Sequence, residues 1–375
     1  MKPNFFATQL CLIVFIVTCS DFGLSSAKAG LTFVLTDTGG AAIGSNARNG
    51  FQAAADFWSS KFSDNINANL NIGFSALGGG ILGSTSVTDT TYSYISYRNA
   101  VVTDAKSIDD AAFAAGLPAG GSFSVYMNRT TDNPNGANSA TPFVDSTGAN
   151  VSQVRIANIE AKALGLIAGN AAATDASITF SSAFNFDFDR SNGIAGGAFD
   201  FVGIAIHEIG HALGFISGVD VLDGNGVGFS SNQFTFVSPL DFTRFSQASE
   251  TAGASLDWTA DNRPKYFSID GGTTVTLANA WSLGVNFGDG NQASHWKDGL
   301  GLGVMDPTAA PGELLVPTAL DFRAFDVLGF DVVAVPEPSS LILLGSALSA
   351  GTLRIRKRNL SQSRKGDGEA EKGMG

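Results

Sequence analysis

The sequence predicts an α+β fold in which a mixed, twisted sheet packs against a central helix. Three observations support this prediction. A strand, a helix and a second strand follow one another near the start of the chain, and an amphipathic helix occupies residues 200–214. A turn-rich segment with β-like runs then separates that helix from one near the C-terminal end. We therefore expect one domain over residues 30–334, with a β-rich insertion at about 216–294.

The spacing of apolar residues predicts the first three elements. Residues 31–35 form a short apolar strand, and residues 66–74 alternate between apolar and polar or small side chains, as in a half-buried strand. The helix between them has an apolar face made of Phe51, Ala54, Ala55, Trp58 and Phe62. This order indicates a sheet with a crossover helix.

Periodicity and capping signals predict the later elements. They are a helix over residues 152–166, a strand over 178–188, and insertion strands over 233–237 and 273–277. A last helix is expected to begin at the capping pattern Thr318-Ala319-Leu320-Asp321 and to stop at Gly329.

The first 29 residues have the features of a secretory signal peptide. Lys2 is followed by an apolar stretch over residues 10–17 and by a small-residue cleavage pattern at residues 27–29. The apolar stretch is too short to span a membrane and ends in a cleavage-like site, which disfavours a buried N-terminal helix. We therefore expect residues 1–29 to be removed when the protein is exported.

The C-terminal end has three consecutive parts. The sequence Val-Pro-Glu-Pro at residues 335–338 precedes an apolar segment, 341–353, and the basic run 354–358. The apolar segment is shorter than the roughly 20 residues of a membrane span, so only transient membrane association is expected. The order of these parts resembles the PEP-CTERM sorting signal of Gram-negative bacteria. The resemblance implies recognition of residues 335–358 by an exosortase and a cell-surface or extracellular location, with residues 359–375 as a polar tail.

The body of the chain is acidic and lacks cysteine. Residues 1–29 hold two basic and one acidic side chain, and the end from Glu337 onward holds seven and four. The remaining 13 basic and 29 acidic side chains give a net charge near −16, which repels nucleic acid and anionic membranes. Both cysteines, Cys11 and Cys19, precede residue 30, so disulfides, thiol catalysis and cysteine-ligated zinc are excluded from the mature chain.

The central helix carries the motif His207-Glu208-Ile209-Gly210-His211. Asp200 is expected to cap this helix and Gly214 to end it. Histidines four residues apart point the same way, so both imidazoles can bind one zinc ion at about 2.0 to 2.1 Å. Glu208 is then placed to act as general base toward a water whose pKa zinc lowers to about 7.

A catalytic zinc site normally has three protein ligands and one open position. The extended metzincin motif would place the third ligand at Ser217, whose hydroxyl is a poor zinc ligand. The candidates are then His295, the remaining imidazole, and Asp220, which lies just past the motif. The alternatives are that His295 stacks on Trp296 within the insertion and that Asp220 belongs to a turn with residues 223–226.

Residues on the C-terminal side of the motif extend the pattern. They are the run 212–215, the pair His295-Trp296, Met305, and the helix end 326–330. Together these parts of residues 199–330 resemble the leishmanolysin-type metzincins, in which an insertion displaces the third histidine. The resemblance implies a metzincin-like catalytic domain with the zinc ligands His207, His211 and His295. It also implies that Glu208 is base and proton donor, that Met305 forms an apolar Met-turn beneath the metal, and that an edge strand near residues 177–182 lines the cleft.

These features predict a secreted zinc metalloendopeptidase acting on protein or peptide substrates. The competing hypothesis is a non-catalytic zinc-binding protein of the cell surface or biofilm matrix, suggested by the Gly-rich, acidic body and the sorting signal. Asp187, Asp189, Ser191 and Asn192 also suggest a calcium site. Gly193 falls one place later than in an EF-hand, however, which favours a solvated turn.

Overall fold

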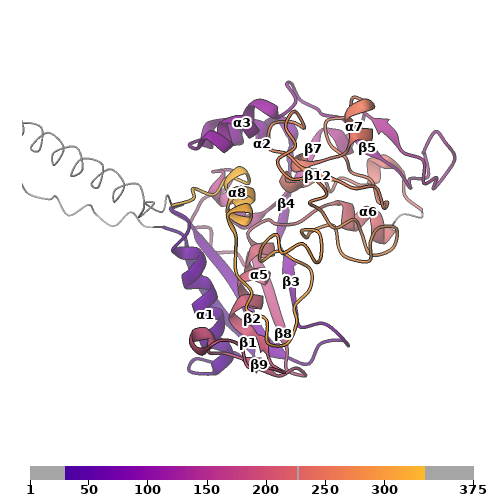
Figure 1. Ribbon diagram of the computed structural model, residues 1–375. Coiled ribbons are helices and arrows are strands. Elements are labelled where there is room, and N and C mark those ends of the chain that lie inside the picture. The colour runs from indigo at the N-terminus through magenta and orange to yellow at the C-terminus, as the bar shows by residue number, and fades with distance from the viewer. Residues whose placement is uncertain (1–29, 226–227, 334–375) are drawn as a thin grey trace, which may run out of the picture. The chain divides into compact units, whose positions relative to one another are not determined.

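The computed structural model describes residues 30–225 and 228–333, which are coloured in Figure 1. The predicted signal peptide, sorting signal and polar tail lie outside these residues. Within the described ranges, no helix has the length and apolar character needed to cross a membrane. The described residues up to Val332 belong to one compact unit.

A four-stranded mixed sheet with the strand order β1-β2-β8-β3 forms one half of this unit. Its strands are β1 (Thr32–Gly39), β2 (Asn67–Ser75), β8 (Ala176–Ser181) and β3 (Gly83–Val87). The first three strands are parallel, and β3 runs antiparallel to β8. Alternate residues of β2, among them Leu70 and Ile72, are buried in the core. The predicted mixed sheet and its first two strands are therefore confirmed.

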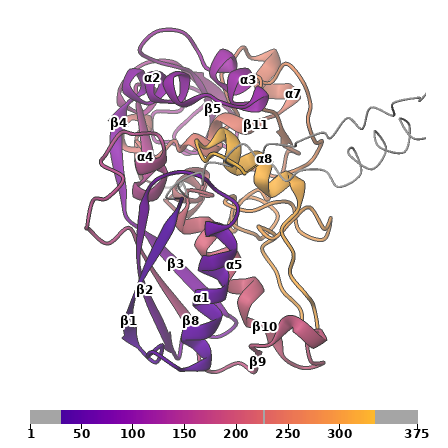
Figure 2. The same ribbon diagram turned by 90° about the vertical axis from the view of Figure 1, so that its left-hand side faces the viewer.

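Two helices pack side by side on one face of this sheet, as Figure 2 shows. The helix α1 (Asn46–Ser59) begins at Ser45, whose hydroxyl accepts a hydrogen bond from Arg48 N, and it buries the predicted apolar face. The helix α5 (Phe201–Ala212) carries the histidine motif. The indole of Trp58 donates to the Ile206 carbonyl at 3.0 Å, which ties the two helices together.

The edge strand beside α5 is β3, not residues 177–182. Those residues fall largely in β8, which lies inside the sheet between β2 and β3. The sequence of β3 is Gly-Ser-Thr-Ser-Val, and small polar residues carry no apolar alternation from which a strand can be recognised. Only its pairing with β8 makes it a strand.

The other half of the unit contains shorter strands and helices (Figure 1). Its strand pairs are β4 (Asp89–Ser93) with β7 (Gln153–Ala157) and β5 (Val125–Met127) with β6 (Phe143–Asp145). Its helices are α2 (Tyr94–Asp104), α3 (Ile108–Gly116) and α4 (Asn158–Ala163). The predicted helix over residues 152–166 is therefore wrong in its first half. Val154 and Ile156 are two residues apart and both are buried in the core, as on one face of a strand. Their segment pairs with β4 and is therefore a strand, not a helix.

The insertion at residues 216–294 is not β-rich. Its regular elements are the helices α6 (Val219–Asn225) and α7 (Gln247–Thr251), the 3₁₀ helices Ser231–Gln233 and Pro239–Thr243, and the pair β11 (Arg244–Phe245) with β12 (Tyr266–Phe267). The expected strands at residues 233–237 and 273–277 do not form. In the second of these ranges, Leu277 forms a single isolated bridge with Phe267.

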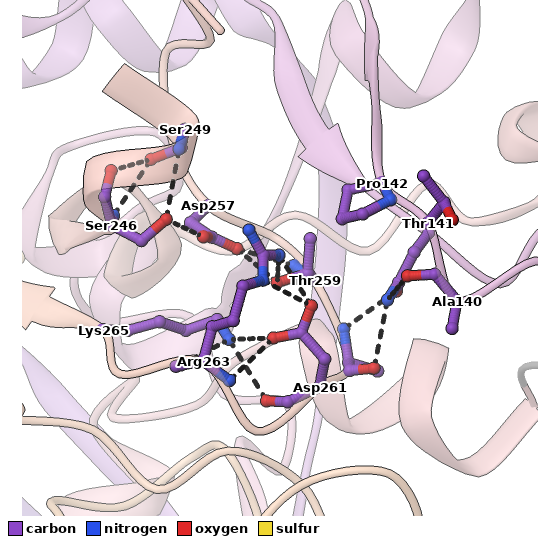
Figure 3. A network of polar contacts seen from close by, with 12 residues as sticks. Ala140, Thr141, Pro142, Ser246, Ser249, Asp257, Thr259, Asp261, Arg263 and Lys265 are labelled. Carbon is purple, nitrogen blue, oxygen red and sulfur yellow. Dashed lines mark hydrogen bonds and ion pairs between the residues drawn. The ribbon is translucent and has the colours of Figure 1, made fainter. Parts of the chain in front are cut away.

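A network of charged and polar side chains holds part of this irregular segment together, as Figure 3 shows. The carboxylate of Asp261 accepts hydrogen bonds from Arg263 at 2.6 Å and from the buried ammonium of Lys265 at 3.1 Å. Arg263 also donates to the Thr259 hydroxyl, and Asp257 accepts from the Thr259 backbone N–H at 3.0 Å. These bonds satisfy polar groups in a segment with few ladder hydrogen bonds.

The remaining regular elements are a short pair of strands before α5 and the last helix of the unit. The predicted strand over residues 178–188 is interrupted, because β9 (Phe186–Asp187) leaves the main sheet and pairs with β10 (Phe199–Asp200). The last helix, α8 (Ala319–Val327), is capped by Thr318 and Asp321 as predicted. Gly329 follows it with a φ of +102°, a left-handed conformation that favours glycine and ends the helix.

A buried carboxylate near the end of α1 makes stability depend on pH. Burial and the neighbouring Asp331 raise the pKa of Asp64 from 3.8 to about 7. The folded state thus binds a proton more tightly than the unfolded state, and this contribution to stability is lost as the pH rises from about 4 to about 7.

We expect Asp64→Asn to raise the free energy of unfolding at pH 8 by roughly 1 to 3 kcal/mol and to change it little at pH 4. The amide oxygen still accepts from Asp331 N, as the carboxylate does at 3.0 Å. Denaturant unfolding at both pH values measures the effect, with the exposed Asp56→Asn as control. Equal effects of Asp64→Asn at pH 4 and pH 8 would contradict the pKa shift.

Candidate metal centre

The histidine-bearing helix is built by local signals that the sequence contains. Asp200 caps α5, since its Oδ1 accepts from Gly203 N at 2.9 Å. Gly214 follows the helix with a φ of +114° and ends it. The predicted apolar face, Val202, Ile206, Ile209 and Leu213, is buried. This burial turns His207 and His211 toward the same side.

The structure brings the three histidines of the chain together. The Nε2 atoms of His207 and His211 are 3.0 Å apart, and that of His295 lies 3.1 Å from His211 and 3.3 Å from His207. Nitrogens that bind one zinc ion tetrahedrally at 2.0–2.1 Å stand about 3.3 Å from one another. In the described part of the chain, this is the one group of three or more histidine, cysteine or acidic side chains that converges closely enough to hold a metal ion.

Hydrogen bonds to backbone carbonyls orient each imidazole. The Nδ1 atoms of His207 and His211 lie 2.7 Å from the carbonyls of Val304 and Phe215, and Nδ1 of His295 lies 3.2 Å from that of Gln292. A carbonyl only accepts, so each Nδ1 carries a proton, and in the neutral imidazole Nε2 then keeps a lone pair. Three lone pairs that face one point repel one another unless a cation lies between them.

The surroundings of His211 and His295 favour the neutral form of these two imidazoles. Burial and the imidazoles of His207 and His295 lower the pKa of His211 well below its usual range. Burial and His207 likewise lower the pKa of His295 to about 3. Neutral imidazole is the metal-binding form, so these two pKa shifts favour metal binding by His211 and His295.

Comparison with protein-family models, with curated proteins and with solved structures finds no match to this chain. The interpretation of the site therefore rests on its own residues.

Glu208 follows His207 directly and is buried against the edge strand β3. Its Oε2 accepts a hydrogen bond from the Thr85 hydroxyl at 2.6 Å. A Cβ at Gly83 would stand 2.8 Å from Glu208 Oε1, so the glycine leaves room for the carboxylate. Burial raises the pKa of Glu208, against the opposing effects of His207 and Thr85. A carboxylate with a raised pKa is a better proton acceptor than an exposed one.

Met305 lies against the central helix at Gly210, the residue before His211. A Cβ at Gly210 would come within 2.5 Å of the Met305 sulfur, so the glycine of the motif permits this contact. Met305 is fully buried, and its carbonyl accepts from Trp296 N at 2.9 Å. It is thus an apolar support rather than a ligand.

Asp220 is not a ligand. Its carboxylate accepts from the backbone N–H of Ser294 at 3.1 Å, from that of Ala293 and from the Ser294 hydroxyl. The peptide between Ala293 and Ser294 is also held on its carbonyl side, because the buried Arg244 donates to the Ala293 carbonyl at 2.9 Å. Asp220 and Arg244 therefore fix the backbone just before His295. Asp220 lies in the first turn of α6 and not in the turn expected at this place.

The suggested calcium loop is a turn whose carboxylates are occupied by backbone donors. Asp187 accepts from Asp189 N and Ala195 N, both at 2.9 Å, and Asp189 accepts from Ser191 N at 3.0 Å. Asp189 and Ser191 are exposed. These side chains hold the turn that joins β9 to β10.

Sequence reasoning missed several residues that shape the centre. Thr85 and Gly83 lie in a segment without apolar alternation, and the sequence indicates Asp220 only as a candidate ligand or a turn residue. The sequence Gly-Ser-Thr-Ser-Val gives no signal for a role at the site, because Thr85 and its partner Glu208 are 123 residues apart in the chain. Only in the central motif does the spacing of nearby residues, His207 and His211, indicate how the side chains are arranged.

Proposed function

We propose that the chain is a zinc-dependent endopeptidase of the metzincin kind, resembling leishmanolysin-type enzymes. The observation that supports this best is the convergence of three Nε2 atoms within 3.0–3.3 Å, with Glu208 buried directly after the first ligand. Three neutral nitrogens and no cysteine suit zinc. When bound, zinc polarises a carbonyl and lowers the pKa of a water molecule.

Glu208 performs the proton transfers of the proposed reaction. Its carboxylate takes a proton from the attacking water and delivers it to the amine that leaves when the peptide C–N bond breaks. Thr85 holds one carboxylate oxygen by a 2.6 Å hydrogen bond, which leaves Oε1 to receive the proton. Burial raises the pKa of this carboxyl and so increases its affinity for the proton in transit.

The edge strand beside Glu208 favours a peptide as substrate. Within the described residues, β3 pairs with β8 on one side, and its other edge has no strand partner. Such an edge offers backbone N–H and C=O groups to an extended peptide, which adds to the sheet as a further strand. Thr85 reaches Glu208 from the same strand, so a peptide bound there passes close to the base.

The competing hypothesis is a non-catalytic zinc protein of the cell surface or matrix. Structural zinc sites are closed by four protein ligands, whereas three donors converge here. A buried carboxylate next to a ligand also costs stability and has no purpose in a structural site. We further propose that the end segments, which resemble a signal peptide and a PEP-CTERM signal, direct the export of the protein. The enzyme would then act after export.

Metal removal tests the proposed function. We expect the purified chain to cleave an unfolded protein such as casein and to lose activity at least about 100-fold when 1,10-phenanthroline removes the metal. One equivalent of zinc should restore activity, and magnesium should not. Undiminished cleavage by metal-free protein would contradict zinc catalysis, and absence of cleavage by zinc-loaded protein would favour the matrix-protein alternative.

A further inference from the structure

We propose that Asp321 is a positioning residue of the metal centre, whose carboxylate sets the placement of His207 and His295 together. Asp321 lies on α8, far along the chain from the motif, and is fully buried. The inference rests on metal binding by the three histidines, which is part of the proposed function. It goes beyond that function because Asp321 touches neither the metal ligands nor a substrate.

The Asp321 carboxylate is saturated by four N–H donors. Oδ1 accepts from the Trp296 indole at 2.8 Å and from Met305 N at 3.4 Å. Oδ2 accepts from Val304 N at 2.9 Å and from Thr318 N at 2.7 Å. Two donors on each oxygen require a group that only accepts, which is an ionised carboxylate.

Two of these donors lead directly to the metal ligands. The Val304 N–H donates to Asp321, and the Val304 carbonyl accepts from His207 Nδ1. Val304 therefore connects the carboxylate to the first ligand. Trp296 is the residue after His295, and its indole N–H is held by the same carboxylate. Asp321 therefore fixes the two backbone segments that carry or orient two of the three ligands.

Capping of α8 does not account for this arrangement. The cap uses one of the four donors, Thr318 N, and the other three belong to the segments around His295 and Met305. The chain also makes room for the carboxylate, because a Cβ at Gly303 would stand 2.1 Å from Asp321 Oδ2. A glycine is needed there only if the carboxylate comes this close to the Met305 turn.

Two neighbouring tryptophans offer a matched test. Trp296 and Trp281 are both fully buried, and their rings stack with centroids 4.5 Å apart. The Trp296 indole donates to Asp321, whereas the Trp281 indole N–H has no hydrogen-bond partner among the described residues. Trp296→Phe thus removes the bond to the carboxylate, and Trp281→Phe removes the same atoms from the same cluster without breaking one.

The experiment measures the zinc affinity of the full chain by competition with a chelator. We expect Asp321→Asn and Trp296→Phe to weaken zinc binding about 10- to 100-fold, as loss of partners that orient metal ligands usually does. Trp281→Phe should bind zinc like the wild type. So should Asp145→Asn, a buried carboxylate elsewhere in the fold that accepts from Asn150 at 2.7 Å. The visible absorption of the Co²⁺-loaded proteins should change in the first two variants alone.

Wild-type zinc affinity in either Asp321→Asn or Trp296→Phe would overturn the proposal, as would equal weakening in the two controls. Trp296→Phe decides the question if Asp321→Asn does not fold. The readout is zinc binding and not peptide cleavage. A wild type that binds zinc tightly but cleaves no peptide would therefore refute the proposed function and leave the role of Asp321 intact.

Discussion

Glu208→Gln is expected to lower kcat/KM for peptide cleavage about 1000-fold or more while the protein keeps its zinc. The amide has nearly the shape of the carboxyl group and can still accept from the Thr85 hydroxyl, which lies 2.6 Å from Oε2. It has no basic oxygen that takes a proton from water, so the chemical step fails without loss of the metal site. Kinetics with a quenched fluorescent peptide and metal analysis of the same sample measure both effects.

Glu160→Gln is the matched control for this variant. Glu160 is a fully buried glutamate on α4 whose carboxyl oxygens have no hydrogen-bond partner among the described residues, and burial raises its pKa well above its usual range, which favours the neutral form. An amide therefore replaces it with little change. Activity should stay near that of the wild type. Peptide cleavage at the wild-type rate by Glu208→Gln would refute the role of Glu208 as base.

His295→Ala is expected to weaken zinc binding roughly 100- to 1000-fold, because four ligands together contribute about 10 to 16 kcal/mol in structural zinc sites. The remaining pair, His207 and His211, leaves two positions open. Asp220→Asn should weaken binding less, since Asp220 holds the backbone before His295 and gives no ligand atom. Chelator competition and metal content measure both variants.

Gln292→Ala provides the control for His295→Ala. The Gln292 side chain is exposed, and His295 Nδ1 interacts with its backbone carbonyl, which the substitution retains. Zinc affinity should stay unchanged in this variant. Full zinc occupancy in His295→Ala, together with its loss in Asp220→Asn, would mean that the third ligand has been assigned wrongly.

Features set by nearby residues were predictable from the sequence. The cap at Asp200, the apolar face of α5 and the stop at Gly214 all depend on positions within one helix, and each is confirmed. The same holds for α8 and its capping pattern. Elimination and resemblance indicate His295 as the third histidine of the site, and the structure places it beside His207 and His211.

Features set by distant contacts were not predictable. Residues 153–157 become a strand only because β4 pairs with them, and the small polar residues of β3 become one only beside β8. The irregular insertion is stabilised in part by the buried Arg244, whose guanidinium donates to the carbonyls of Ser282 and Ala293, 38 and 49 residues further along the chain. The sequence predicts the capping role of Asp321, but not its contacts with Trp296 and Val304, which join segments that lie apart in the chain.

Hydrolysis of a peptide in ¹⁸O-labelled water tests the central claim most directly. Mass spectrometry of the products from zinc-loaded protein should show new termini, with one ¹⁸O atom in each new carboxyl group and none in the new amine. Glu208→Gln at equal zinc occupancy should give almost no product. Zinc-loaded protein that produces no new termini from any unfolded substrate, or product formation that is unaffected by Glu208→Gln, would contradict the assignment of this site as a zinc endopeptidase.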